Sequence, residues 1–236
     1  MKASRKVHRI GGTVLALGVV VGLAHWPTTT RYGINYRWAS RRIPLYEKTI
    51  NFLSRHLQTK RLAEELTRGA ANDEEKLLTL FQWVGAHVQP TPKGFPVVDD
   101  HPLYILIRGY GAEDQRTEAF ALLAHYAGFS SSVARLKAPG TGTLLHVALV
   151  RQGIRHLVFD ITHQLVFRTA QGELAGLEEL RHDPVLLASA SQGLLVDGVP
   201  YERFFLAEAS LSSYSRSDAQ ELWPRLWQMM RRLVQR

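Results

Sequence analysis

The sequence contains no cysteine in its 236 residues. Disulfide bonds, thiolate metal sites and any cysteine nucleophile are therefore excluded. With 18 glycines and 10 prolines, the chain is too poor in both residues for a collagen-like or low-complexity protein. Hydrophobic residues make up 45% of the sequence and charged residues 21%, which is typical of a globular protein rather than a disordered one.

Short motifs that mark common enzyme and cofactor sites are also missing. The sequence has no P-loop, dinucleotide-binding fingerprint, zincin motif or nucleophile elbow, so we predict no cofactor. Asp160 and His163 lie three residues apart, after His156, but residues three apart on a strand face opposite sides. The two would converge only if the strand turned at Thr162, and no metal site is predicted.

Acidic residues are scarce at the two ends of the chain. Residues 1–61 hold twelve lysines and arginines against one acid, and residues 216–236 hold five against two. Residues 62–215 hold twelve against eighteen, so the net charge of +8 comes from the ends. A nucleic-acid-binding protein normally carries its basic residues on the folded domain. Basic ends fit a membrane surface better, and no nucleic-acid partner is predicted.

An apolar segment follows the basic leader at the N-terminus. Residues 10–26 carry no Lys, Arg, Asp or Glu, and their number is at the lower limit for a membrane-spanning helix. The pattern also fits a secretory signal peptide, but no clear small-residue cleavage motif is present. We therefore predict an uncleaved membrane anchor at residues 10–26. It would place the protein in the bacterial inner membrane as a single-pass protein.

The residues around this segment bear on orientation and assembly. Four basic residues precede it and four arginines soon follow it, so the positive-inside rule is nearly balanced. The tight cluster in the short leader favours a periplasmic body. Gly18 and Gly22 have the GxxxG spacing that lets membrane helices approach closely. A homo-oligomer or a membrane-protein partner is predicted, through the anchor and the C-terminal helix.

Hydrophobic periodicity predicts helices first and strands second, which is an α+β layout. We expect an irregular linker at residues 27–42, a helix of about 15 residues from Leu45, and a second short helix that closes at Gly69. Two further helices are expected, the first after a capped start at residues 72–75 and the second ending at Gly128. An antiparallel meander is expected from residues 132–137, 144–151, 155–161 and 164–168.

We divide the chain into four parts. These are a leader and anchor at 1–27, a membrane-proximal linker and helix at 28–60, the main domain at 61–185, and a C-terminal extension at 186–236. The extension ends in a basic amphipathic helix up to Arg236. Its apolar stripe either closes the body or docks on the membrane or a partner, and the sequence favours neither.

Several stretches of the main domain resemble the bacterial transglutaminase-like (papain-like cysteine protease) superfamily, roughly over residues 60–185. They are the acidic helix start at 72–75, the Gln-Trp-Val sequence at 82–84, the glycine-rich turn at 109–112, the helix end at 127–129, and the strands with His146 and Asp160. The resemblance implies a transglutaminase-like fold in which N-terminal helices pack on an antiparallel sheet.

The same resemblance implies a set of site residues. In this superfamily the turn delivers a cysteine to a helix start, and a histidine and an aspartate follow on the next two strands. The family's Cys-Asp-Gln-Arg stretch falls on residues 113–116, its histidine on His146 and its aspartate on Asp160. Glu113 therefore occupies the nucleophile position, and thiol acyl transfer is excluded.

Two functional hypotheses follow. In the first, Glu113 forms an ion pair with His146, itself held by Asp160, in a site that has lost its chemistry. The chain is then a pseudoenzyme that acts as a binding or scaffolding subunit, and the resemblance implies a role in cell-envelope or exopolysaccharide biosynthesis. In the second, the same three residues act on an envelope polysaccharide or peptide. A subunit of a larger membrane complex is a third possibility.

Overall fold

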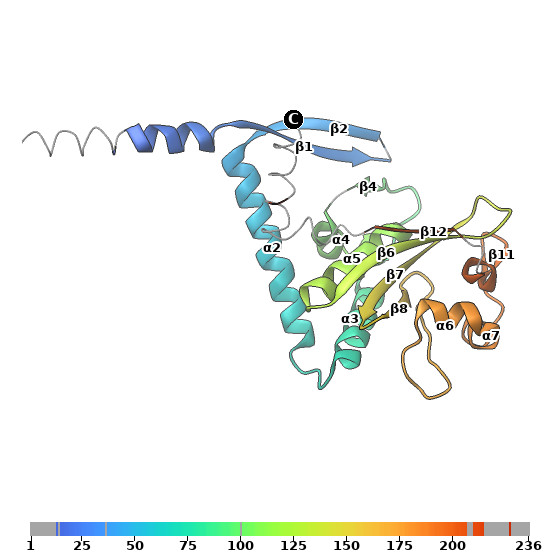
Figure 1. The fold of residues 1–236 in the computed structure, drawn as a ribbon. Helices are drawn as coiled ribbons and strands as arrows, with labels where there is room; N and C mark the ends of the chain where they lie inside the picture. The colour runs from blue at the N-terminus through green and yellow to red at the C-terminus, as the bar shows by residue number, and fades with distance from the viewer. Residues whose placement is uncertain are drawn as a thin grey trace, which may run out of the picture.

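Alternating apolar residues in the second half of the body form the strands that the sequence predicted. β6 (Ser130–Lys137), β7 (Leu144–Gln152) and β8 (Arg155–Asp160) pair as an antiparallel meander in the computed structural model. β9 (Leu165–Val166) continues the meander, and β12 (Ser210–Tyr214) pairs with the free side of β6 (Figure 1). The structure describes residues 13, 15–35, 37–99, 101–206, 210–214 and 227.

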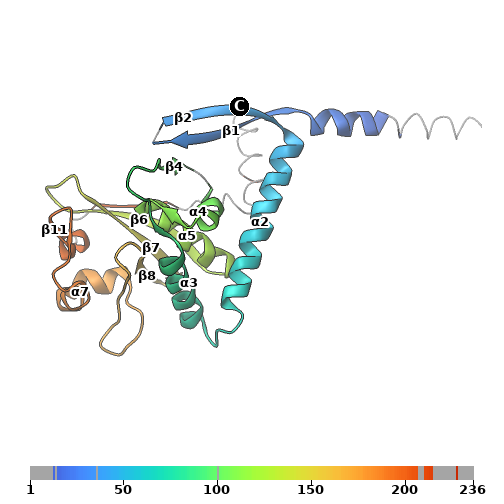
Figure 2. The ribbon, with the colours of Figure 1, turned by 180° about the vertical axis from the view of Figure 1, so that it is seen from behind.

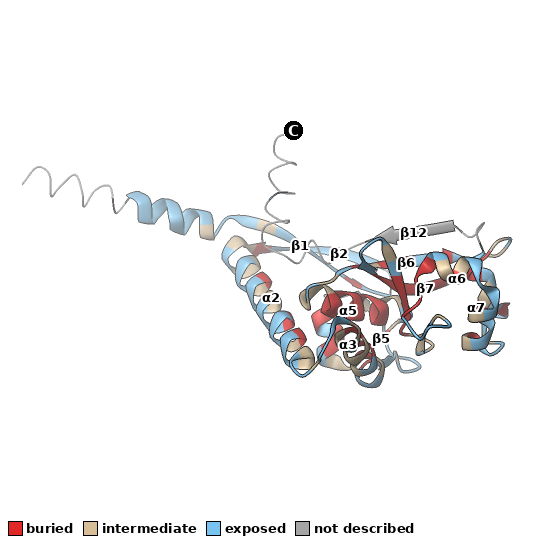
Figure 3. Cartoon of the chain, turned by 60° about the horizontal axis from the view of Figure 1, so that its bottom comes forward, coloured by how far each residue is buried: buried red, intermediate tan, exposed pale blue. Residues whose placement is uncertain are grey.

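Helices from the first half of the chain cover one face of this sheet. The central helix, α5 (Glu113–Tyr126), contacts α2 (Leu45–Thr67), α3 (Asp73–His87) and α4 (Pro102–Arg108), as well as strands β6 and β7 (Figures 1 and 2). Residues 115–124 of α5 are all buried (Figure 3), because neighbours surround this helix on every side. The predicted packing of N-terminal helices on an antiparallel sheet is therefore present.

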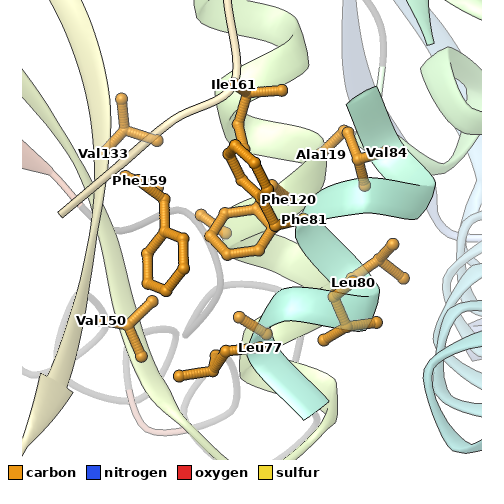
Figure 4. Packing of buried hydrophobic residues seen from close by; sticks show 14 of the residues in the cluster. Leu77, Leu80, Phe81, Val84, Ala119, Phe120, Val133, Val150, Phe159 and Ile161 are labelled. Atoms are coloured by element: carbon orange, nitrogen blue, oxygen red, sulfur yellow. The ribbon is translucent and has the colours of Figure 1, made fainter. Parts of the chain in front are cut away.

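Three phenylalanines form the centre of the core between these helices and the sheet. Phe81 comes from α3, Phe120 from α5 and Phe159 from β8, and their side chains point toward one another (Figure 4). The ring centroids of Phe120 and Phe159 lie 5.0 Å apart, and Phe81 lies 6.1 Å from the first and 5.8 Å from the second. Such tilted and edge-on contacts add to the free energy gained by burying the rings.

The other face of the sheet is covered by the segment that follows it. α6 (Leu177–His182), α7 (Pro184–Ser191) and the 3-10 helix η1 (Tyr201–Phe205) pack there around a second apolar cluster. The small hairpin of β10 (Leu195–Val196) and β11 (Val199–Pro200) joins α7 to η1. The sheet is therefore buried between two layers of helices.

The expected irregular linker at residues 27–42 is wrong, because a long hairpin occupies this region. β1 (Pro27–Ile34) pairs along its whole length with β2 (Arg37–Pro44), and β4 (Val98–Asp99) adds to the other side of β1. Threonines and aromatic residues favour strands. Asn35 begins the turn in the left-handed conformation, with φ of 49°, which tight hairpins require.

The two helices expected between Leu45 and Gly69 are a single helix, α2, of 23 residues. No glycine or proline interrupts the sequence between them, so nothing ends the first helix. Phe52, Thr59 and Ala63 are buried on one side of the helix, at the spacing of a continuous helical face. The capped helix start at residues 72–75 is confirmed, since Asn72 accepts a hydrogen bond from the Glu75 amide.

The N-terminal and C-terminal segments are described only in part. Residues 15–24 are helical and continue toward β1 (Figure 1), whereas residues 10–12 and 14 of the expected anchor lie outside the described residues. Within the described ranges, no helix combines the length and apolar character that crossing a membrane requires. Most of the expected C-terminal helix also lies outside them. Trp227 is helical and exposed.

We expect Phe120→Ala to lower the free energy of unfolding by about 3–5 kcal/mol, because it removes a fully buried ring and leaves a cavity. Urea unfolding followed by circular dichroism measures this loss. Ile154→Ala is the control, since Ile154 is 97% exposed and its truncation should change stability by less than about 0.5 kcal/mol. Similar losses in the two variants would contradict the described core.

Candidate functional site

A tight arrangement of two short strands places Glu113 at the start of α5. β3 (Gln89–Pro90) pairs in parallel with β5 (Tyr110–Gly111), directly before the helix. Gly109 ends α4 in the left-handed conformation, with φ of 74°. A Cβ atom on Gly111 would lie 3.0 Å from the side chain of Ile105 and 3.2 Å from that of Gln115, so a larger residue here would require both side chains to shift.

Gln115, in the first turn of α5, fixes the helix start to its surroundings. Its Oε1 accepts a hydrogen bond from the Ala112 amide at 3.1 Å, and its Nε2 donates one to the Val98 carbonyl at 2.7 Å. The buried Arg116 donates from Nε to the Val88 carbonyl at 2.8 Å. Burial lowers the pKa of Arg116, against the opposing effects of the Asp160 and Glu113 carboxylates. Both side chains therefore have structural partners, and Glu113 is left exposed.

His146 lies on β7, on the face of the sheet that α5 covers. The hydroxyl of Thr117 in α5 donates to the backbone carbonyl of Glu113 at 3.0 Å and lies 3.5 Å from the carbonyl of His146. Burial lowers the pKa of His146, and the nearby Asp114, Glu113 and Asp160 carboxylates oppose this effect. Its buried Nδ1 has no hydrogen-bond partner. The imidazole is therefore neutral at pH 7 and is not oriented through this nitrogen.

Asp160 forms no hydrogen bond with His146, although its carboxylate lies close enough to oppose the lowering of the histidine's pKa by burial. The register pairs Ala148 with Phe159, so the next residues along the two strands, Val147 and Asp160, share a face. Val147 belongs to the second apolar cluster, on the side of α6 and η1, whereas Ala148 and Phe159 belong to the cluster around α5. The expected hydrogen bond between His146 and Asp160 does not form. Directly paired residues of this hairpin are an odd number of positions apart in the chain, whereas His146 and Asp160 are an even number apart, so they are not cross-strand neighbours.

The carboxylate of Asp160 is engaged by other groups instead. Its Oδ2 accepts hydrogen bonds from the Tyr201 hydroxyl and from Nδ1 of His163, both at 2.8 Å. Its Oδ1 accepts from the His163 amide at 3.0 Å. These three donors surround a carboxylate that has no exposed surface, which is the condition under which a buried charge is stable.

The pKa values of both side chains that donate to Asp160 are raised. The hydrogen bond to Asp160 raises the pKa of His163, against the opposing effect of burial. Burial and the same carboxylate raise the pKa of Tyr201 well above its usual value. The tyrosine therefore stays protonated and donates, and the ion pair of His163 with Asp160 is favoured.

The turn at residues 161–164 brings His163 back over Asp160. Gln164 adopts the left-handed conformation, with φ of 58°, and its Nε2 donates to the Ile161 carbonyl at 2.6 Å. The Gln164 side chain occupies the space where a Cβ of Gly85 in α3 would lie. A side chain at Gly85 would therefore push this turn away from the helix.

The expected ion pair between Glu113 and His146 is absent from the described part of the chain, where no hydrogen bond or ion pair joins the two residues. The strand does turn at Thr162, so Asp160 and His163 meet. The described ranges contain no cluster of three histidine or acidic side chains that could hold a metal ion. In the described residues, His146 therefore lies near carboxylates but is not hydrogen-bonded to Glu113 or Asp160 through its Nδ1.

Comparison with known proteins gives limited matches. No protein-family profile and no curated protein matches the sequence. A provisionally assigned cysteine protease structure from Cytophaga hutchinsonii matches with a TM-score of 0.40 and 15% identity, over 73% of this chain and 56% of its own. A structure described as a TGase matches with a TM-score of 0.39 and 12% identity, over 61% and 47%.

A third structure, a provisionally assigned protease from Parabacteroides distasonis, has a TM-score of 0.37 and 12% identity, over 58% of this chain and 36% of its own. The chain thus spans between 36% and 56% of the lengths of these three proteins. At this level of likeness, the chemistry of the site has to be argued from its own residues.

The sequence interpretation missed the role of His163 and Tyr201 as partners of Asp160. For His163, the signal was its position three residues after Asp160, together with a turn at Thr162. For Tyr201, no sequence signal exists, because it lies 41 residues away and reaches the carboxylate only through the packing of η1. The two-residue turn after Gln152 could have predicted that Asp160 is not the cross-strand neighbour of His146.

We expect Tyr201→Phe to lower the free energy of unfolding by about 1–3 kcal/mol, because the buried Asp160 carboxylate loses a donor that water cannot replace. Chemical denaturation of the purified protein measures the change. Tyr46→Phe is the matched control at a partly exposed position, and it should shift stability by less than about 0.5 kcal/mol. An unchanged stability in Tyr201→Phe would argue against the described network.

The raised pKa of His163 predicts a pH-dependent contribution to stability. The folded state binds the proton more tightly than the unfolded state, so this contribution is complete below the ordinary histidine pKa of about 6.5. It is lost as the pH rises through the folded pKa. The stability difference between the wild type and His163→Gln should therefore be larger near about pH 5.5 than near about pH 9. Denaturation at both pH values tests this, and a difference that grows with pH would contradict it.

Proposed function

We propose that this protein is a membrane-anchored pseudoenzyme with a transglutaminase-like fold. It acts as a binding or scaffolding subunit in bacterial cell-envelope or exopolysaccharide biosynthesis, with its body on the periplasmic side of the inner membrane. Glu113 occupies the position of the family's cysteine. The envelope setting is supported by the sequence resemblance, and the membrane anchor by the charge pattern of the N-terminus and the exposed apolar side chains of residues 15–23.

One observation carries the non-catalytic assignment. The buried Asp160 carboxylate is engaged by His163 and Tyr201, while Nδ1 of His146 has no partner. In a nucleophile–histidine–aspartate site, the aspartate orients the histidine and stabilises its charged form. Without that contact and without a thiol, His146 lacks the support that acyl transfer needs.

The alternative, an enzyme that uses Glu113 with His146 and Asp160, receives less support from the same geometry. Acid–base catalysis requires groups within hydrogen-bond reach of one another or of the substrate. The Glu113 and Asp160 carboxylates both act to raise the pKa of His146, against the larger effect of burial, but the Asp160 carboxylate is hydrogen-bonded to His163 and Tyr201 instead. This supports the non-catalytic assignment, because no hydrogen bond links the three residues in the described part of the chain.

The proposal predicts that Glu113→Gln and His146→Ala leave the function intact in the source bacterium. A strain that lacks the gene is complemented with each variant, and envelope polysaccharide output and protein abundance in the membrane are measured. Glu113→Gln loses a favourable carboxylate at a helix start, which costs only about 0.3–1 kcal/mol, so both variants should accumulate and complement fully.

Asp160→Asn is the matched control, because it breaks the buried network and should reduce abundance. Loss of output at normal abundance in both Glu113→Gln and His146→Ala would overturn the pseudoenzyme assignment in favour of an enzyme. Normal envelope output in the strain that lacks the gene altogether would overturn the envelope role.

A further inference from the structure

A basic and aromatic cleft lies beside the β1–β2 hairpin, apart from the degenerate site. It has a volume of about 580 Å³, which is within the range of ligand-binding pockets. The hairpin, α2 and α4 with its preceding residue form its walls. The lining residues are Thr30, Arg31, Tyr32, Trp38, Arg41, Arg55, His101 and Tyr104.

Three guanidinium groups give the cleft its charge. Arg31 and Arg41 are exposed on the hairpin, and Arg55 is half-buried on α2. None of the three pairs with a carboxylate of the described residues, and the buried Nε of Arg55 has no hydrogen-bond partner. A buried donor without a partner is costly, so a shift of the Arg55 guanidinium toward an anion in the cleft would be favoured. Guanidinium groups match phosphate oxygens in a bidentate geometry.

The surroundings of the cleft indicate where such an anion comes from. The hairpin continues directly from the helix at residues 15–24, and the two lie along one edge of the molecule (Figures 1 and 2). Leu15 is 72% exposed, Leu17 is 65% exposed, and Trp26 beside the hairpin is 62% exposed. An apolar helix next to arginines and aromatic rings is the arrangement that suits a lipid surface with anionic headgroups.

We propose that this cleft binds the phosphate of an anionic phospholipid headgroup, with Arg41 and Arg55 on the phosphate oxygens and Arg31 adding to the positive charge of the hairpin. The rings of Tyr32 and Trp38 lie at the level of the headgroups, where amphipathic aromatic side chains are favoured. This inference adds lipid-headgroup recognition to the proposed function and rests on its membrane location. Headgroup binding holds the hairpin edge against the lipid surface and so orients the body of the protein.

The test is the binding of the purified full-length protein to vesicles, measured by flotation. Vesicles of phosphatidylcholine alone report insertion of the apolar segment, and vesicles that also contain phosphatidylglycerol report headgroup recognition. We expect tighter binding to the anionic vesicles, and this preference should weaken as salt is raised. Equal binding to both vesicles would overturn the cleft proposal and leave the anchor intact. An anionic preference without binding to neutral vesicles would overturn the anchor and support the cleft.

Two pairs of variants distinguish phosphate binding in the cleft from the general attraction between basic residues and an anionic surface. Arg31→Gln with Arg41→Gln should lose more than about 25-fold in affinity for anionic vesicles, because each arginine near such a surface contributes about fivefold and the direct contact of Arg41 with the phosphate is also lost. Arg37→Gln with Arg42→Gln removes the same charge from the same hairpin outside the cleft, so it should lose at most the general surface contribution of about 25-fold. Equal losses in the two pairs would overturn the cleft as the binding site.

Arg55→Gln and Arg68→Gln form the second pair, since each removes one charge from α2 or its end and only Arg55 lines the cleft. Arg55→Gln alone should lose about fivefold in affinity. Thermal unfolding of each variant verifies that it is folded. Two competing soluble probes are glycerol 3-phosphate, which carries a free phosphate, and alginate, which represents a carboxylated polysaccharide. If either binds in a way that depends on Arg55 while the anionic-vesicle preference is missing, the lipid assignment is overturned.

Discussion

Side chains alternate between the two faces of a β-strand, and this alternation decides which residues of the candidate site can meet. The hairpin of β7 and β8 closes through two residues, and its register places Asp160 beside Val147 rather than beside His146. His146 therefore lies beside Thr117 of α5, whereas Asp160 is bound by Tyr201 of η1. A shift of one position in either strand would pair the histidine with the aspartate. Whether His146 and Asp160 can form a hydrogen bond thus depends on a shift of one residue in the pairing of β7 with β8.

A second consequence of this register is that Asp160 becomes a structural cross-link. Its carboxylate joins the end of β8, the turn that carries His163, and η1 with Tyr201. Because these donors are buried with it, the charge is compensated by hydrogen bonds that water cannot replace. The segment after residue 185 is therefore held to the sheet by polar contacts as well as by the apolar cluster.

Local sequence signals predicted much of the fold. The capped start of α3, the helix that ends before Gly128 and the strands of the meander all depend on neighbouring residues. The β1–β2 hairpin was missed because exposed strands lack a buried face, so apolar alternation is weak where the burial pattern is mostly exposed. The sequence predicts two helices where α2 is a single one. The apolar residues suggest a break between them, but no glycine or proline lies there to end the first helix.

The sequence by itself determined that no thiol chemistry is possible, that charge is concentrated at the ends, and that Glu113 begins a helix. It also identified His146 and Asp160 as strand residues. Only the tertiary structure decided that these two side chains form no hydrogen bond, and that Tyr201 completes the shell of Asp160. The physical reason is that spacing along the chain specifies local conformation, whereas contacts across a sheet depend on register and on the elements packed against each face.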